Sequence, residues 1–108
     1  MNKDLPPPIA AYVEANARLD ADGMLAAFAP DAAVIDDGRR YGGRTELKGW
    51  IRTATLGNRA VFSPDAWREE DGRIVVDGLT AGAFRGSPIR FTFRFTLADG
   101  AIAALEVA

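Results

Sequence analysis

The pattern of hydrophobic and polar positions predicts helices in the first half of the chain. Ile9 and Val13 lie on one stripe at helical spacing, and they predict a helix from about Pro8 to Leu19. A short second helix is expected to end near Phe28, and a third is expected from about Thr45 to Thr55. Helical periodicity stops after this third segment.

The second half of the chain shows the two-residue alternation that is typical of β-strands. It is clearest from Ile89 to Leu97, where Ile, Phe and Leu occupy one face and Arg or Thr the other. Pro64 indicates a sheet edge or a bulge, and Gly78 and Gly82 suit the bends of a curved sheet. Helices first and hairpin-linked strands afterwards indicate an α+β domain with helices on one face of an antiparallel sheet. The predicted strands are residues 32–36, 39–41, 59–68, 73–84, 89–97 and 101–107.

The strand from Ala32 to Asp36 carries the most conspicuous candidate for chemistry. Pro30 is expected to end the helix before it, because proline lacks an amide hydrogen. Alternate residues of a strand share a face, so Val34 and Asp36 point the same way. If Val34 enters the core, Asp36 is either a base in an apolar pocket or a carboxylate hydrogen-bonded to the amides of the Asp37-Gly38 turn.

Composition limits the domain organisation and the partners. The chain has 108 residues, net charge −2 and 48% hydrophobic residues, which indicates a single domain over residues 1–108. It has no basic stripe, so no nucleic-acid partner is expected. It has no apolar run of about 20 residues, so no membrane partner is expected. The N-terminal residues 1–8 lack an apolar signal-peptide core, and a cytoplasmic location is expected.

Absent residue types narrow the chemistry further. The sequence has no cysteine and no histidine. This excludes thiolate nucleophiles, cysteine zinc sites and the Ser-His-Asp triad. Asp36-Asp37 and the acidic run 69–71 lack calcium-loop spacing, and no cofactor motif is visible. No metal and no cofactor are therefore expected, and catalysis would use Asp, Glu, Tyr, Arg, Lys or a backbone group.

Several segments together carry a family resemblance. They are the long first helix, the short helix with Asp22-Gly23, the Phe-Ala-x-Asp-Ala-x-Val stretch of residues 28–34, Tyr41-Gly42-Gly43-Arg44 and the helix with Trp50-Ile51. The chain resembles the nuclear transport factor 2-like superfamily over nearly its whole length, most closely its SnoaL-like and ketosteroid isomerase-like branches. The resemblance implies a cone-shaped curved sheet wrapped around about three helices. It also implies a pocket between the first helix, the third helix and the concave face.

The resemblance also implies roles for individual residues. Asp36 holds the place of the isomerases' catalytic aspartate, and Tyr12 that of the tyrosine that donates to the developing oxyanion. Asn16, one helical turn after Tyr12, is expected in the same pocket. The isomerases place a second acid on a late strand, where this chain has Phe91 or Thr92. This departure argues against steroid isomerase activity but leaves a site with one base and one donor.

We therefore expect a small-molecule pocket protein that acts as a cofactor-independent acid-base enzyme. It would abstract a proton from carbon of an apolar, ring-containing substrate, as an isomerase, a cyclase or an eliminating lyase. Asp36 and Tyr12 are the expected catalytic residues. The alternatives are a non-catalytic dimeric ligand-binding domain and an engineered pocket on this fold, with which Gly49 and Leu56-Gly57-Asn58 would be compatible. The expected partners are a small apolar molecule and a second copy in a homodimer, with Trp67 at the interface. The residues expected to bind substrate are Asn16, Trp50, Ile51, Phe91 and Phe93.

Overall fold

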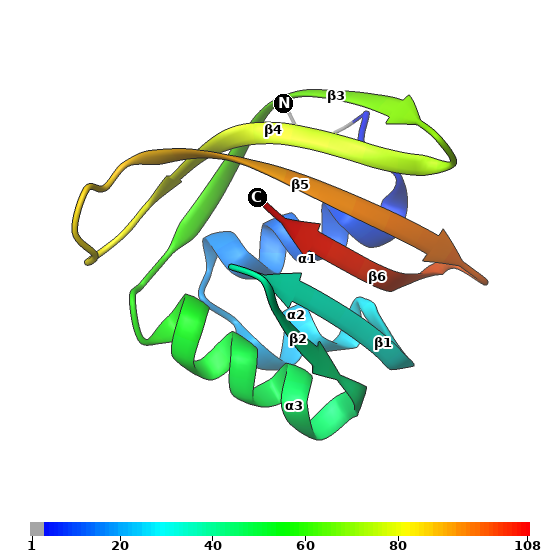
Figure 1. The fold of residues 1–108 in the computed structure, drawn as a ribbon, viewed down its shortest axis with the longest axis horizontal. Helices are drawn as coiled ribbons and strands as arrows, with labels where there is room; N and C mark the ends of the chain where they lie inside the picture. Colours follow the sequence, from blue (N-terminus) through cyan, green and yellow to red (C-terminus); the bar gives the residue numbers. More distant parts are fainter. Residues whose placement is uncertain (1–3) are drawn as a thin grey trace.

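The computed structural model describes residues 4–108 (Figure 1). Residues 1–3 lie outside this range. They belong to the N-terminal segment 1–8, in which we expect no signal peptide. The helices are α1 (Pro7–Ala17), α2 (Ala21–Ala26) and α3 (Gly43–Trp50), and α3 continues as a π-helix, η1 (Ile51–Leu56). The strands are β1 (Phe28–Asp36), β2 (Arg39–Gly42), β3 (Val61–Glu70), β4 (Arg73–Ala81), β5 (Ile89–Ala98) and β6 (Ala101–Val107).

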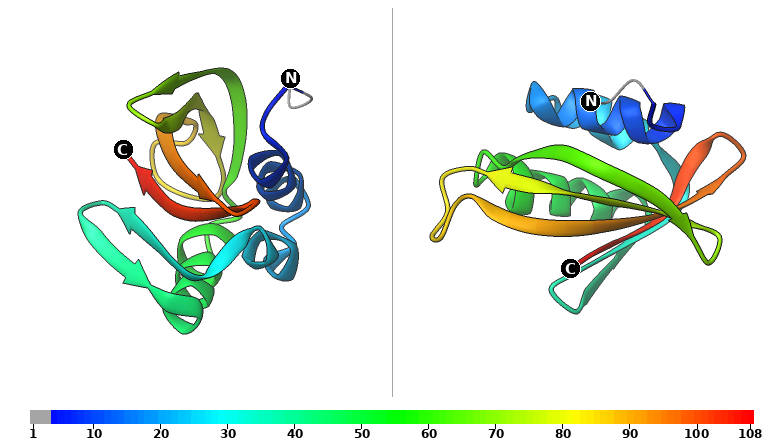
Figure 2. Two further views of the ribbon diagram at one scale, coloured as in Figure 1. Left: turned by 90° about the vertical axis from the view of Figure 1, so that its right-hand side faces the viewer. Right: turned by 90° about the horizontal axis from the view of Figure 1, so that it is seen from above.

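The six strands form one mixed sheet in the order β2-β1-β6-β5-β4-β3. All neighbouring strands are antiparallel except β1 and β6, which are parallel. The sheet is open and curved, and the helices lie on one side of it (Figure 2). This confirms the predicted α+β class and the expected curved sheet with the helices on its concave side. Within residues 4–108, no helix has the length and apolar character needed to cross a membrane.

The core fills the space between the helices and the concave face of the sheet. Ile9 and Val13 of α1 are buried there, as the helical stripe predicted. Val34 of β1 is also fully buried, so Asp36, two residues later, faces the same side. Phe95 lies at the centre of the sheet's inner surface with no exposed area. The alternation in β1 and β5 therefore predicted the inner face correctly.

Strand β3 is an edge strand with a bulge, as Pro64 indicated. Its pairing with β4 shifts register between Pro64 and Ala66. A Cβ atom at Gly78 of β4 would lie 2.9 Å from the Pro64 Cα, so glycine permits this close approach. The bulge also reverses the side-chain parity, and Trp67 lies opposite the fully buried Val76. Trp67 is therefore not on the uncovered side of the sheet, where we expected it to meet a partner.

Two other expectations about local structure are wrong. Helix α2 ends at Ala26, and Pro30 lies inside β1, in the stretch where pairing with β6 shifts register. The missing amide hydrogen of Pro30 is tolerated there because the ladder is already interrupted. Gly49 is exposed, with open space where its Cβ would be, so it does not widen the pocket.

Candidate functional site

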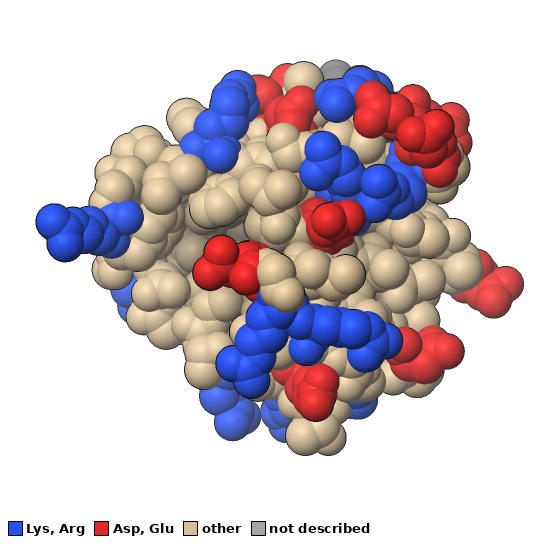
Figure 3. Space-filling model, in the orientation of Figure 1, with Lys and Arg blue, Asp and Glu red and all other residues tan. Residues whose placement is uncertain are grey.

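A cavity of about 270 Å³ lies between the helices and the concave face of the sheet. In the space-filling view a hollow is visible between the loop that joins β4 to β5 and the end of β1 (Figure 3). Much of its wall is aromatic, with a small number of polar side chains among the rings. The residues that line it are Tyr12, Asn16, Asp36, Trp50, Ala54, Thr55, Asn58, Ala60, Phe62, Thr80, Phe84, Phe91, Phe93 and Val107.

Asp36 ends β1 and is partly buried at the edge of the cavity. Its Oδ2 accepts a hydrogen bond of 2.9 Å from the indole Nε1 of Trp50. Within residues 4–108 no hydrogen bond joins its carboxylate to the amides of the Asp37-Gly38 turn, which was the structural alternative. The Trp50 bond therefore fixes one carboxylate oxygen and leaves Oδ1 available to a ligand.

Tyr12 brings a hydroxyl group from α1 to the same cavity. Its ring packs edge-on against Phe28, with 5.6 Å between ring centroids, and against Phe95. Burial raises the pKa of Tyr12 well above its ordinary value, and the nearby Asp36 carboxylate raises it further. The phenol therefore stays protonated at neutral pH and can donate a hydrogen bond.

Asn16 lines the cavity, but its side-chain amide serves the fold. Its Nδ2 donates to the Ala60 carbonyl at 2.9 Å and lies 4.0 Å from the Met24 sulfur. Its Oδ1 accepts from the Phe62 amide at 2.7 Å. These bonds attach the start of β3 to α1 and take up both donor hydrogens. Asn16 is thus not free to donate to a ligand, and its predicted substrate contact is reduced to one remaining acceptor position.

The predicted aromatic wall is largely present. Trp50, Phe91 and Phe93 all line the cavity, whereas Ile51 does not. Ile51 is 1% exposed and packs in the core, one helical turn after the buried Leu47. Trp50 directly precedes Ile51, so its side chain leaves the helix in a different direction. Trp50 and Ala54, which follows it at helical spacing, both face the cavity. Placing Ile51 in the pocket was therefore wrong.

Sequence reasoning missed several lining residues. Phe62 stacks on Phe93 with 4.0 Å between ring centroids and 10° between planes. Thr80 lies on the inner side of β4 with Val76, and this parity was a signal that the sequence offered. Thr55 lies in the π-helix η1, a type of segment found often at functional sites, and it has no simple sequence signal.

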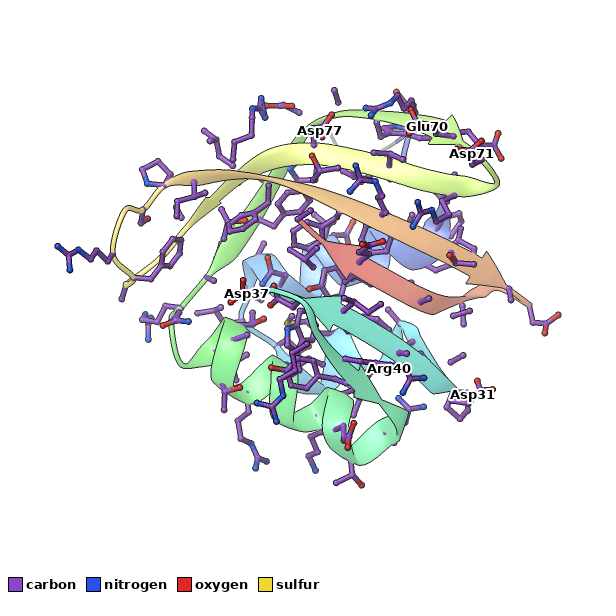
Figure 4. All side chains as sticks on the ribbon, in the orientation of Figure 1. Asp31, Asp37, Arg40, Glu70, Asp71 and Asp77 are labelled. Carbon is purple, nitrogen blue, oxygen red and sulfur yellow. The ribbon has the colours of Figure 1, made fainter. Side chains whose placement is uncertain are left out.

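Charged side chains are placed mostly outside the cavity. Asp36 is the one carboxylate among the lining residues. Glu70 and Asp71 lie at the turn between β3 and β4, and Asp77 lies midway along β4 (Figure 4); none of the three lines the cavity. Asp77 accepts a hydrogen bond from Thr92 at 2.7 Å and pairs with Arg68 of β3 at 3.1 Å. Residues 4–108 contain no group of three or more carboxylates that could hold a metal ion.

Comparisons with known proteins agree with this geometry. A structure of a proposed polyketide cyclase, SMa1630 from Sinorhizobium meliloti, matches with 33% identity and a TM-score of 0.92, over 100% of this chain and 99% of that one. TerC co-crystallized with polyporic acid matches with 20% identity and a TM-score of 0.80, over 94% and 88%. A hypothetical protein with a ketosteroid isomerase-like fold from Catenulispora acidiphila matches with 15% identity and a TM-score of 0.80, over 95% and 85%. The last two show the fold alone. No curated protein matches the sequence at a significant level.

The match to a sequence family is nearly complete. The SnoaL-like domain matches residues 9–105, from the first turns of α1 to the end of the sheet. This span includes Tyr12, Asp36 and Trp50. Together with the nuclear transport factor 2-like architecture, it shows that this chain belongs to the SnoaL-like domain family.

Proposed function

We propose that the protein is a cofactor-independent acid-base enzyme that removes a proton from carbon of an apolar, ring-containing ketone. The observation that carries the proposal is the presence of Asp36 and Tyr12 in one cavity. The two groups are close enough for the carboxylate to help raise the pKa of the phenol. One side chain can accept a proton, the other can donate a hydrogen bond, and the surrounding wall is apolar.

The chemistry assigns one role to each group. Asp36 Oδ1 takes a proton from the carbon next to a substrate carbonyl. The electron pair of that C–H bond forms a C=C bond, and the π pair of the carbonyl moves onto its oxygen, which gives an enolate. The Tyr12 hydroxyl donates to this developing negative oxygen, which is the stabilisation that matters most in such reactions. Return of the proton at another carbon completes an isomerisation. Attack of the carbanion on a second carbonyl of the same molecule, followed by protonation of its oxygen, completes a cyclisation.

The relationship to the Sinorhizobium meliloti protein favours cyclisation over the other reactions of this class. That protein is described as a proposed polyketide cyclase and matches along the full chain. The stacked Phe62 and Phe93 rings and the neighbouring Phe91 suit a flat, unsaturated substrate. A non-catalytic ligand-binding domain is the second candidate, because the same wall would hold such a ligand without turnover.

Exchange of the α-hydrogen of tetralone, a two-ring ketone, in heavy water separates the two candidates. The protein should accelerate this exchange, followed by proton NMR, and Asp36→Asn should lower the rate by about 10²-fold. Asp37→Asn is the matched control, because Asp37 is the exposed next residue and does not line the cavity. It should leave the rate unchanged.

Thermal melts complete this experiment. Asparagine can still accept the Trp50 hydrogen bond, so the melting temperature of Asp36→Asn should stay the same or rise slightly. A protein that binds tetralone without accelerating exchange would be a ligand-binding domain. A clear loss of stability in Asp36→Asn would indicate a structural carboxylate.

A further inference from the structure

The wall of the cavity formed by β4 carries a buried hydroxyl group without a partner. Thr80 is 8% exposed. Its Oγ1 is the one buried side-chain oxygen or nitrogen of residues 4–108 that has no hydrogen bond. The residue lies on the inner side of β4, with Val76 and Gly78, and lines the cavity. Buried polar atoms are almost always paired, because an unpaired one loses its bonds to water without replacement.

The residues paired with Thr80 on the two neighbouring strands are both apolar. Phe62 lies directly opposite on β3, and Ile89 lies directly opposite on β5. The Phe62 ring is itself stacked on Phe93. Valine has nearly the same shape as threonine and would fill this position without an unpaired hydroxyl. The hydroxyl therefore has no partner within residues 4–108, and a ligand in the cavity can supply one.

We infer that the Thr80 hydroxyl binds an oxygen atom of the ligand at the end of the cavity remote from Asp36. Thr80 is on β4 and Asp36 is on β1, with β6 and β5 between them. When the paired residues are followed from strand to strand across the sheet, the residue of β4 in line with Asp36 is Val76. Thr80 lies four residues beyond Val76 on β4. With strands about 4.8 Å apart, the two side chains start from well-separated parts of the curved sheet.

This placement defines the class of substrate. The ligand carries its reacting carbonyl near Asp36 and Tyr12, and a second oxygen, as a hydroxyl or carbonyl group, on a ring at the far end. Threonine can donate to either group and can accept from a hydroxyl. The identity of the reacting end rests on the proposed function, whereas the Thr80 contact requires only that the cavity binds the ligand.

Two matched pairs of ketones test the contact. Tetralone and fluorenone are each compared with the derivative that carries a phenolic hydroxyl on the side away from the carbonyl. The protein should bind at least one hydroxylated derivative about tenfold more tightly than its parent, the effect of about one net hydrogen bond. Thr80→Val should abolish this advantage without weakening binding of the parent ketone, and Thr80→Ser should retain it. Isothermal titration calorimetry measures the affinity of each of the three proteins for the four ketones.

Stability and turnover separate this inference from the other possibilities. Without ligand, Thr80→Val should melt at the same or a higher temperature, because it removes an unpaired hydroxyl. A lower melting temperature, or a hydroxyl advantage that survives in Thr80→Val, would overturn the inference. Equal affinity for both members of each pair, or binding of neither pair, would also overturn it. A protein without exchange activity that keeps the Thr80-dependent advantage would refute the catalytic proposal and support this contact.

Discussion

Trp50 and Asp36 are joined by a hydrogen bond of 2.9 Å across 14 residues of sequence. The indole of α3 donates to the carboxylate at the end of β1, and both side chains line the cavity. Trp50 is 3% exposed and its ring is part of the core, so the donor has little freedom to move. The bond holds one carboxylate oxygen, and within residues 4–108 no hydrogen bond is made to the other, Oδ1.

Trp50→Phe tests this orienting role. Phenylalanine keeps an aromatic ring but has no N–H, so the carboxylate loses its fixed direction. We expect the exchange rate at saturating tetralone to fall about tenfold, with little change in the tetralone dissociation constant, since a misplaced group costs rate more than binding. Trp67→Phe is the matched control, because Trp67 lies outside the cavity lining. An equal loss in both variants, or a loss confined to affinity, would contradict the orienting role.

The raised pKa of Tyr12 predicts that stability falls in alkaline solution. Because the folded state holds this proton more tightly than the unfolded state, its stabilisation is complete below the ordinary tyrosine value of about 10. As pH rises above that value the unfolded chain releases the proton while the folded chain keeps it. The free energy of unfolding should then fall by about 1.4 kcal/mol per pH unit from this group. Urea denaturation between about pH 9 and about pH 11 measures the slope.

Two tyrosine variants identify the source of that slope. Tyr12→Phe should remove it, whereas Tyr41→Phe should retain it, because Tyr41 is a partly buried residue of β2 outside the cavity lining. If the slope is the same in the Tyr12→Phe variant as in the unmodified protein, the phenol of Tyr12 is not the group that burial holds in its protonated form.

The uncovered side of the sheet predicts assembly. We propose that two copies pair through this side, because the helices cover only the other one (Figure 2). Ile35 and Leu79 are large apolar residues on it, 39% and 45% exposed, and Arg73 and Glu106 pair with each other there at 3.1 Å. Analytical ultracentrifugation at low micromolar concentration should therefore show a homodimer.

A pair of substitutions locates the interface. Leu79→Glu should shift the protein toward the monomer, because it places a charge in the apolar contact. Ile89→Glu is the matched control: Ile89 is 37% exposed, but it lies opposite Thr80 and so belongs to the inner side of the sheet. A monomeric starting protein, or equal dissociation in both variants, would refute this interface.

The sequence by itself determined most of the elements and the division of β1 and β5 into two faces. Helical spacing at Ile9 and Val13 and the alternation that starts at Ile89 depend only on the local geometry of helices and strands. The same parity argument directed Asp36 toward the core side, and Pro64 marked the edge strand and its bulge. Each of these features is encoded within a few neighbouring residues.

The tertiary structure decided which polar side chains remain available in the cavity. Asn16 looked as suitable as Tyr12, but Ala60 and Phe62, more than forty residues away, use its amide. Trp50 and Ile51 looked equivalent until packing turned one to the cavity and the other to the core. These outcomes depend on long-range contacts between elements, which local spacing does not encode.

The parallel pairing of β1 with β6 and the unpaired hydroxyl of Thr80 have the same origin. Both arise when segments distant in sequence close around one space. The segments of the chain that meet around this space determine which strands pair and which groups can bond to a buried hydroxyl. The sequence therefore determined the type of most segments and the alternation of their faces, and the folded arrangement decided which side chains meet in the cavity.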